Sequence, residues 1–186
     1  MRIVAGRFRG RRLATLGKGD AGAHLRPTTD RVRESLFSIL TGGRFGDPVA
    51  GARVLDLFAG TGALGIEALS RGAAHVTLVD DGRLAGRLLR ENIALLDIAA
   101  ETRLMRANAT RLPTAPGAAD LVFLDPPYGK GLGERALASA LGQGWVADTA
   151  LVVWEDSAPV TPPEGWQILD TRQFGDTRIN FLRAAP

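Results

Sequence analysis

A glycine-rich turn after an apolar run constrains the fold of this chain more than any other feature. Residues 54–65, VLDLFAGTGALG, place Gly60, Gly62 and Gly65 in the order G-x-G-x-x-G. A helical pattern follows the turn, and Asp80 stands 18 residues beyond Gly62. Strand, turn, helix and distant carboxylate are the parts with which a dinucleotide-binding unit holds its ligand. The pattern therefore predicts an α/β ligand-binding fold and leaves the ligand to be identified.

The rest of the body alternates between strand-like and helix-like segments. Strands are predicted at 53–58, 75–80, 102–107, 119–125 and 150–155, and helices at 63–71, 84–96 and 134–141. Such alternation is typical of a parallel sheet with helices on both faces. The end differs, because WQILDTRQF and TRINFLR flank Gly175 and Asp176 as the arms of a β-hairpin do. We predict a Rossmann-like α/β fold: a mostly parallel, seven-stranded sheet with an antiparallel C-terminal hairpin strand.

Positive charge gathers at the N-terminal end of the chain. Residues 1–50 carry ten Lys and Arg against four Asp and Glu, whereas residues 51–186 carry 13 against 16. A basic arm on a mildly acidic body favours a polyanionic partner. We therefore divide the chain into a basic arm with a helix at 1–50 and an α/β domain at 51–186. The residues expected to contact phosphates are Arg7, Arg9, Arg11, Arg12 and Arg26.

The second half of the arm, RPTTDRVRESLFSIL, predicts a helix capped by Thr29 or Asp30. Apolar residues recur at helical spacing and are expected to pack on a core: Val32, Leu36, Ile39 and Leu40. We expect Arg31, Arg33 and Glu34 to lie off that face, with Glu34 or the body as alternative partners for the two arginines.

The composition disfavours several classes of protein. The chain has no cysteine, and therefore no disulfide and no thiolate metal site, and its two histidines are far apart in sequence. No apolar run approaches the length of a membrane-spanning helix, and the start MRIVAGRFRG lacks the apolar core of a signal peptide. We expect no metal, no membrane association and a cytoplasmic location.

The carboxylates beside the glycine turn favour a cationic cofactor over a dinucleotide. Asp56 near the end of the first strand would repel a pyrophosphate, but it would attract the sulfonium and ammonium groups of S-adenosylmethionine. Asp80 ends the second strand and can accept both ribose hydroxyls of that cofactor. Simpler roles stay open for both: Asp56 as a cap for local backbone N–H groups, and Asp80 as a helix cap. A dehydrogenase is the least favoured interpretation.

The stretch LVFLDPPYGKG at 121–131 is the most specific signal in the chain. A strand would deliver Asp125 to the ligand edge of the sheet, and Pro126 and Pro127 remove two backbone donors. A rigid corner of acceptors remains, the Asp125 carboxylate and the Pro126 carbonyl, with the Tyr128 ring as a platform for a flat base. By holding both N–H groups of an exocyclic amine, it would free the nitrogen lone pair to attack a methyl carbon. The alternative is a plain turn that uses two prolines.

Taken together, these stretches resemble the RsmD family, bacterial enzymes that methylate N2 of one guanine in 16S ribosomal RNA. The resemblance is carried, in this order, by MRIVAGRFRGRRL, RPTTDRVRESLFSIL, VLDLFAGTGALGIEALSRGA, LVFLDPPYGKG and FGDTRINFLR. It implies a class I S-adenosylmethionine-dependent methyltransferase domain at 51–186 and an RNA-binding arm at 1–50. It further implies 16S rRNA, within a small-subunit assembly particle, as the partner.

The resemblance also implies roles for single residues. Asp125, Pro126 and Tyr128 would present and hold the target guanine. The cofactor pocket would be lined by Asp56, Phe58, Gly60, Gly62 and Asp80. Where related enzymes often carry an Asp that contacts the adenine amine, this chain has Asn108. The Asn108 side-chain oxygen can accept the same hydrogen bond, and a plain loop role is an equal alternative.

Two other functions are compatible with the same residues. An amino-methyltransferase acting on DNA adenine or on another RNA would use the same acceptor corner, because both substrates offer an NH₂ group. A ribosome-assembly factor that binds RNA without catalysis would need the basic arm alone. The intact D-P-P-Y sequence argues against that factor, since a binding module has no use for such a corner.

Overall fold

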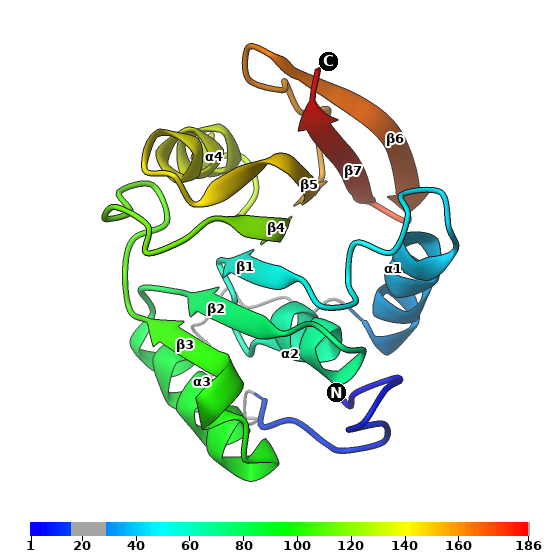
Figure 1. Ribbon diagram of the computed structural model, residues 1–186, viewed down its shortest axis with the longest axis vertical. Coiled ribbons are helices and arrows are strands. Elements are labelled where there is room, and N and C mark those ends of the chain that lie inside the picture. Colours follow the sequence, from blue (N-terminus) through cyan, green and yellow to red (C-terminus); the bar gives the residue numbers. More distant parts are fainter. Residues whose placement is uncertain (16–28, 186) are drawn as a thin grey trace.

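A seven-stranded sheet forms the centre of the computed structural model, which describes residues 1–15 and 29–185 (Figure 1). The strands are β1 Arg53–Leu57, β2 His75–Val79, β3 Thr102–Met105, β4 Ala119–Leu124, β5 Val146–Asp156, β6 Trp166–Phe174 and β7 Thr177–Ala184. The helices are α1 Asp30–Thr41, α2 Ala63–Ser70, α3 Arg83–Leu96, the 3₁₀ turn η1 Ala99–Glu101 and α4 Leu132–Gly142.

The strand order is β3-β2-β1-β4-β5-β7-β6. Strands β1 to β5 pair in parallel, whereas β7 runs antiparallel to both β5 and β6. The predicted Rossmann-like sheet with a C-terminal hairpin is thereby confirmed. The chain returns through α2 and α3 between parallel strands, so the N-terminus of each helix lies at the carboxyl edge of the sheet and its C-terminus at the amino edge.

Helices cover both faces of the sheet. Successive residues of a strand point to opposite faces, so Val54 and Leu55 belong to different hydrophobic clusters. The Val54 cluster contains residues of α1, α2 and α3, and the Leu55 cluster contains residues of α4. Ile3 and Leu13 of the arm also join the Val54 cluster, so the described arm shares a core with the α/β body. The division into an RNA-binding arm at 1–50 and an α/β domain at 51–186 therefore stays a prediction, and it concerns the functions of the two parts.

Helix α1 begins as its sequence predicts, because the Thr29 hydroxyl oxygen accepts the Val32 N–H at 3.3 Å. The expectation that Arg33 lies off the packed face is wrong, because its side chain is fully buried, whereas the alternative of a partner in the body is borne out. Arg33 contacts Asp30 at 3.0 Å and Glu67 of α2 at 3.4 Å, and it donates to the Arg2 carbonyl. Partner carboxylates on other elements offset the cost of burying the guanidinium, and helical periodicity cannot detect them.

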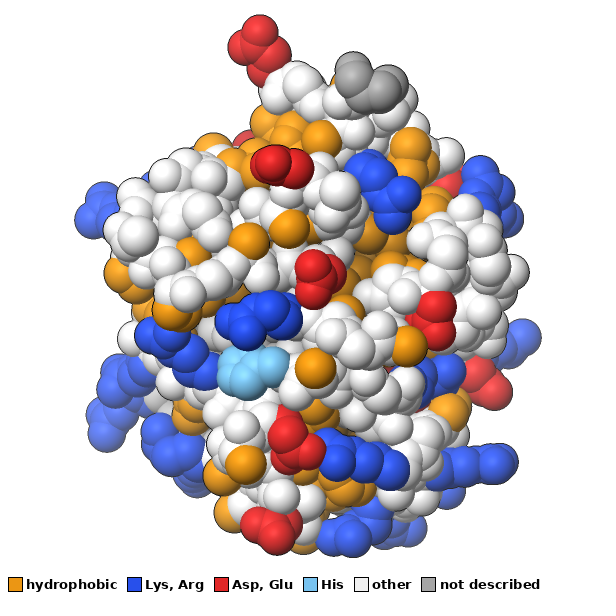
Figure 2. Space-filling view, in the orientation of Figure 1, with side chains coloured by type: hydrophobic (Ala, Val, Ile, Leu, Met, Phe, Trp, Pro, Cys, Tyr) orange, Lys and Arg blue, Asp and Glu red, His pale blue; other side chains and the backbone are white. Residues whose placement is uncertain are grey.

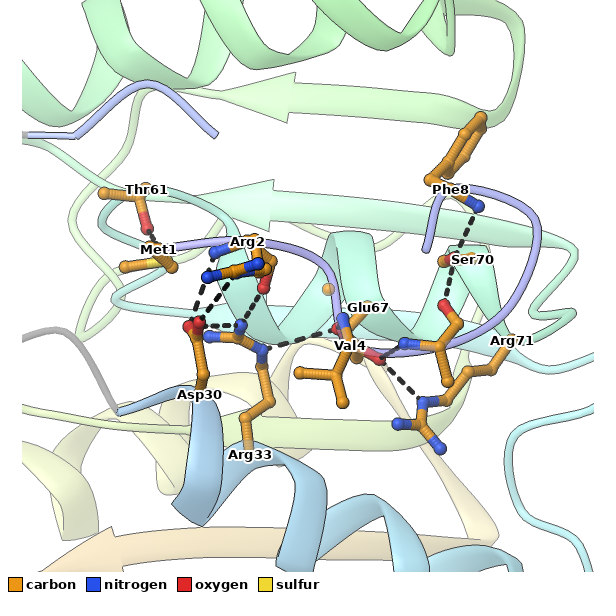
Figure 3. A network of polar contacts seen from close by, with 12 residues as sticks. Met1, Arg2, Val4, Phe8, Asp30, Arg33, Thr61, Glu67, Ser70 and Arg71 are labelled. Atoms are coloured by element: carbon orange, nitrogen blue, oxygen red, sulfur yellow. Dashed lines mark hydrogen bonds and ion pairs between the residues drawn. The ribbon is translucent and has the colours of Figure 1, made fainter. Parts of the chain in front are cut away.

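Glu67 ties the N-terminal segment to α2 (Figure 3). This buried carboxylate accepts the N–H of Val4 at 2.8 Å and the N–H of Ala5 at 3.0 Å. It also pairs with Arg33 and, at 2.8 Å, with Arg71. Two backbone donors and two guanidinium groups thus satisfy one buried charge.

Ser70 fixes the next residues of the segment at the C-terminus of α2 (Figure 3). Its hydroxyl oxygen accepts the Phe8 N–H at 3.0 Å and donates to the Ala5 carbonyl at 2.6 Å, while its carbonyl accepts the Arg7 N–H at 2.8 Å. Arg2 and Arg12 form an antiparallel bridge, so residues 2–12 make a hairpin-like ribbon. The tip of this ribbon, residues 6–10, lies at the amino edge of the sheet.

Candidate active site

Four neighbouring strands end in one row at the carboxyl edge of the sheet. The paired residues along this row are Leu57 of β1, Val79 of β2, Leu124 of β4 and Trp154 of β5. The residues that follow them in the chain therefore emerge side by side: Phe58, Asp80, Asp125 and Glu155. This is the edge at which a parallel α/β sheet binds ligands. The fold brings the predicted cofactor turn and the predicted acceptor corner together.

The turn after β1 has an unusual backbone. Phe58 has a φ of 62°, and Gly60 and Gly62 have φ values of 57° and 80°, so three positions are left-handed. For Phe58 this conformation costs on the order of 1–3 kcal/mol. Ala59 donates to the Val79 carbonyl at 3.0 Å, and Gly62 donates to the Ala59 carbonyl at 2.7 Å. These hydrogen bonds hold the strained turn, and such strain is concentrated at ligand-binding sites.

Asp56 lies beneath the turn and is 2% exposed. Its Oδ2 accepts the N–H of Gly65 at 2.9 Å. A Cβ at position 65 would stand 2.7 Å from the side chains of Val76 and Leu78, so only glycine lets α2 approach β2 this closely. Burial, and to a lesser extent the charge of Asp80, raise the pKa of Asp56 to about 7, although the hydrogen bond from Gly65 acts in the opposite direction. The capping role left open by the sequence is therefore observed, and the ligand contact of Asp56 stays a prediction.

Asp80 uses both carboxylate oxygens to order the backbone around the turn. Oδ2 accepts the N–H of Gly60 at 2.9 Å, and Oδ1 accepts the N–H of Gly82 at 2.8 Å, immediately before α3. Burial raises the pKa of Asp80, and the neighbouring Asp81 adds to this effect. Each oxygen keeps a further lone pair. The arrangement therefore leaves Asp80 able to accept the two hydroxyls of a ribose.

The acceptor corner follows β4. Pro126 is buried, and Asp125 is a half-buried residue at the edge of the sheet. Burial raises the pKa of Asp125 well above its usual range, and the charges of Glu155 and then Asp56 raise it further. None of Asp56, Asp80 and Asp125 forms an ion pair with a Lys or Arg of the described residues. The edge therefore carries several carboxylates whose ionised forms lack a positive partner.

Two residues that the sequence reasoning missed hold Tyr128 in place. The Tyr128 hydroxyl donates to Glu155 Oε1 at 3.0 Å and lies 3.3 Å from Thr177 Oγ1. Burial raises the pKa of Tyr128, so the phenol stays protonated. The place of Glu155 at the end of the apolar run ALVVWE was a signal, because neighbouring strand ends meet at one edge. Thr177 gave no such signal, since only the folded hairpin brings β7 there.

Asn108 lies in the loop after β3 and orders that loop. Its Oδ1 accepts the backbone N–H of Thr110 at 2.9 Å and the Thr110 hydroxyl at 2.8 Å. The loop role that the sequence left open is thus present. The contact of Asn108 with an adenine amine stays a prediction.

Two arginines of the arm contact residues at the amino edge of the sheet. Arg7 pairs with Glu101 at 2.7 Å just before β3, and Arg11 donates to the Leu95 carbonyl near the end of α3 at 2.9 Å. Both contacts are at the amino edge, where α3 ends. Arg9 and Arg12 are exposed, and Arg26 lies outside the described residues. Figure 2 shows one face of the molecule, and Lys and Arg side chains gather on its lower half, over α3, β3 and the N-terminal ribbon.

Within residues 1–15 and 29–185, no group of three or more His, Cys, Asp and Glu side chains could hold a metal ion. In the same part of the chain, no helix has the length and apolar character needed to cross a membrane.

Comparisons with known proteins give consistent results. Residues 1–183 match the family described as Conserved hypothetical protein 95. The chain is 39% identical to Ribosomal RNA small subunit methyltransferase D of Escherichia coli K12 over 172 residues, 90% of this chain and 82% of that protein. Its counterpart of the same name from Haemophilus influenzae is 34% identical over 181 residues, 94% of this chain and 89% of that protein. A solved structure of a putative methyltransferase, yhhF from Escherichia coli, superposes with a TM-score of 0.83 at 38% identity, covering 100% of this chain and 99% of that one.

Proposed function

Because the chain belongs to the RsmD family, the one described as Conserved hypothetical protein 95, we propose that it methylates the exocyclic N2 amine of a guanine in 16S ribosomal RNA. Family and fold make it a methyltransferase with a Rossmann-like sheet. S-adenosylmethionine as methyl donor, guanine N2 as acceptor and a small-subunit assembly particle in the cytoplasm complete the proposal. The carrying observation is that β1 and β4 end side by side, which sets the glycine turn against the Asp125–Tyr128 corner.

The charge of the edge fits this cofactor. Asp56 and Asp80 both have raised pKa values, partly because each lies near another carboxylate. A sulfonium and an ammonium group would supply the missing positive charge and lower these pKa values. A pyrophosphate would bring more negative charge to the same place. The same residues therefore disfavour a dinucleotide, although the glycine spacing is common to both ligands.

Each residue then has a defined part in the transfer. S-adenosylmethionine would supply an electrophilic methyl carbon. The Asp125 carboxylate and the Pro126 carbonyl accept the two N–H groups of the amine and turn its lone pair toward the glycine turn. Tyr128 stacks on the guanine ring, in an orientation fixed by its hydrogen bond to Glu155. The raised pKa makes Asp125 a stronger proton acceptor than an ordinary aspartate, so we assign it the departing proton.

One transfer assay tests the proposal. The purified protein is incubated with methyl-labelled S-adenosylmethionine and, separately, unmodified 16S RNA, assembled small subunits and duplex DNA. Label in RNA, recovered as N2-methylguanosine after digestion, is the expected result. Label found only in DNA would show that the substrate is DNA and not RNA. If the protein binds RNA but no label appears in any substrate, it is a non-catalytic assembly factor and not an enzyme.

A variant tests the role of the corner. Asp125→Ala should abolish methyl transfer and leave the affinity for S-adenosylmethionine nearly unchanged, because this carboxylate is assigned to the amine and not to the cofactor. Asp148→Ala, at an exposed carboxylate of β5, is the matched control and should behave as the wild type. Loss of cofactor binding in the Asp125 variant would show that its role is misassigned.

A further inference from the structure

A groove between α1 and β6 is not used by the chemistry proposed above. Its volume is about 660 Å³, within the range of small-ligand sites, which is roughly 300–1,000 Å³. Its walls include Arg31, Glu34, Ser35 and Ile39 of α1, and Arg172 and Phe174 of β6. The α1 residues recur at helical spacing and share one helix face, while the other face packs on the core. Strand β6 is the edge strand of the sheet.

The groove adjoins the candidate active site. Phe174, the last residue of β6, pairs across the hairpin turn with Thr177. The Thr177 hydroxyl lies 3.3 Å from the hydroxyl of Tyr128. A strand of nucleic acid whose base stacks on Tyr128 would therefore pass directly into the groove with its next nucleotides.

The lining fits a single-stranded nucleic acid. Arg31 is exposed and forms no ion pair with a described residue, and the Arg172 side chain is 46% exposed although it contacts Asp170. These two guanidinium groups suit phosphates. Phe174 offers an aromatic face for a base. The Ser35 hydroxyl donates to the Arg31 carbonyl at 3.0 Å, so its oxygen is left as an acceptor for a ribose 2′-hydroxyl.

We propose that this groove binds the single-stranded RNA segment next to the target guanine. The inference rests on the proposed function, because it requires RNA as the substrate. A target base must leave its stack before it reaches Tyr128, and its neighbours then need a surface of their own. The tip of the basic ribbon cannot provide that surface, since it lies at the amino edge. The groove holds the reacting end of the RNA, and the ribbon contacts RNA elsewhere.

Three variants of the full chain test the groove, each measured for KM, kcat and RNA affinity with unmodified small subunits. Phe174→Leu keeps apolar volume but removes the ring, and it should raise KM at least about fivefold, the lower end of a lost base stack. Arg31→Ala should also raise KM. Glu34→Gln removes a negative charge from the groove and should lower KM. Cofactor affinity should stay at the wild-type value in all three. Tm should stay unchanged for Arg31→Ala and Glu34→Gln, whereas Phe174 packs partly on the core, so Phe174→Leu should lower Tm slightly.

Controls separate stacking and charge from general damage. Phe174→Trp keeps an aromatic face and should restore the wild-type KM. Arg135→Ala, at an exposed arginine of α4, removes the same charge as Arg31→Ala and should change nothing. Unchanged KM and RNA affinity for Phe174→Leu and Arg31→Ala in an active enzyme would refute the groove and leave the methyltransferase function standing.

Ultraviolet crosslinking on assembled subunits identifies the occupant. A crosslink between the β6 peptide and 16S RNA is expected, and a crosslink to a ribosomal protein in its place would overturn the proposal. A wild type that transfers no methyl group, yet loses RNA affinity through Phe174→Leu, would refute the proposed function and retain the groove as an RNA site.

Discussion

Asp56 has a proposed contact with the ligand and an observed place in the fold, and the two make opposite demands on its charge. Its carboxylate is buried against the first turn of α2, where it caps the Gly65 N–H, and burial raises its pKa to about 7. In the folded protein it holds its proton up to a higher pH than in the unfolded chain. The contribution of protonated Asp56 to the free energy of unfolding is therefore fully present below the ordinary pKa of 3.8, and it is lost as the pH rises through about 7.

Replacing Asp56 tests that conflict. Asp56→Asn cannot ionise, so it does not lose stability when the pH rises through the pKa of Asp56. Between about pH 5 and about pH 8, the unfolding free energy of the variant should therefore rise relative to that of the wild type. Denaturant unfolding at both pH values measures it. Calorimetry at the higher pH should show weaker S-adenosylmethionine binding by the variant, because the carboxylate is lost. A constant stability difference across this pH range would mean that Asp56 ionises normally.

Tyr128 depends on a partner from another strand. Tyr128→Phe keeps the ring but loses the hydrogen bond to Glu155, so the ring is held less firmly. We expect kcat to fall by about tenfold, the equivalent of one hydrogen bond of roughly 1–1.5 kcal/mol, with cofactor affinity unchanged. Steady-state kinetics measure this. Glu155→Gln keeps an acceptor oxygen and should retain most of the activity, whereas equal losses for Glu155→Gln and Glu155→Ala would exclude a positioning role.

The pH profile reports on Asp125. Its carboxylate must be ionised to accept an N–H group and then a proton, and its pKa is raised by burial and by Glu155. Activity should therefore fall on the acid side at a pH well above the ordinary pKa of 3.8. A profile of kcat/KM against pH measures the acid limb. An acid limb near the ordinary value would show that Asp125 is not the titrating group.

At the scale of elements, the N-terminal ribbon and α2 are held together by close backbone contact. A Cβ at Gly6, where φ is +78°, would lie 1.8 Å from the Ser70 carbonyl oxygen. Gly10, where φ is +82°, has nothing within 4 Å of the same position. The two glycines share a backbone conformation and differ in their surroundings, so they form a matched pair.

Alanine at these positions separates strain from contact. Gly10→Ala should cost about 1 kcal/mol of unfolding free energy for the left-handed backbone alone. Gly6→Ala should cost clearly more, because the ribbon must also leave Ser70. Denaturant unfolding measures both, and proteolysis should cut the ribbon of the Gly6 variant first. Equal costs would mean that the ribbon does not rest on α2.

At the scale of the whole molecule, the two candidate RNA contacts lie at opposite edges of the sheet. The groove and Tyr128 are at the carboxyl edge, whereas Arg7 and Arg11 are bound near the ends of η1 and α3. An RNA that contacts both must extend along the molecule. Lys and Arg side chains also lie over α3 and β3, at the lower left of the view (Figures 1 and 2).

Salt dependence tests this extended contact. For each phosphate that the protein neutralises, the logarithm of RNA affinity should fall by roughly 0.7–0.9 per logarithmic unit of salt. The double variant Arg9→Ala and Arg12→Ala should lower that slope and leave kcat unchanged, because neither residue is near the acceptor corner. Filter binding over a salt series measures it. An unaltered slope would show that Arg9 and Arg12 do not contact phosphates and that other arginines do.

The amino-acid sequence by itself determined the features that depend on near neighbours in the chain. Alternating strands and helices, the left-handed glycine turn, the Thr29 cap and the closing hairpin follow from periodicity and backbone preferences over a few residues. The meeting of Asp80 and Asp125 at one edge also followed, because parallel strands end together.

Only the tertiary structure decided the contacts made across long stretches of chain. Glu155 reaches Tyr128 over 27 positions, Arg33 reaches Glu67 over 34, and Arg7 reaches Glu101 over 94. Helical periodicity placed Arg33 off the packed face, because no local pattern reports a carboxylate on another element. The edge at which the basic ribbon lies was equally undetermined, since Ser70 and Glu67 of α2 fix it. Local sequence encodes conformation, whereas charge burial and partner choice arise only when distant elements pack together.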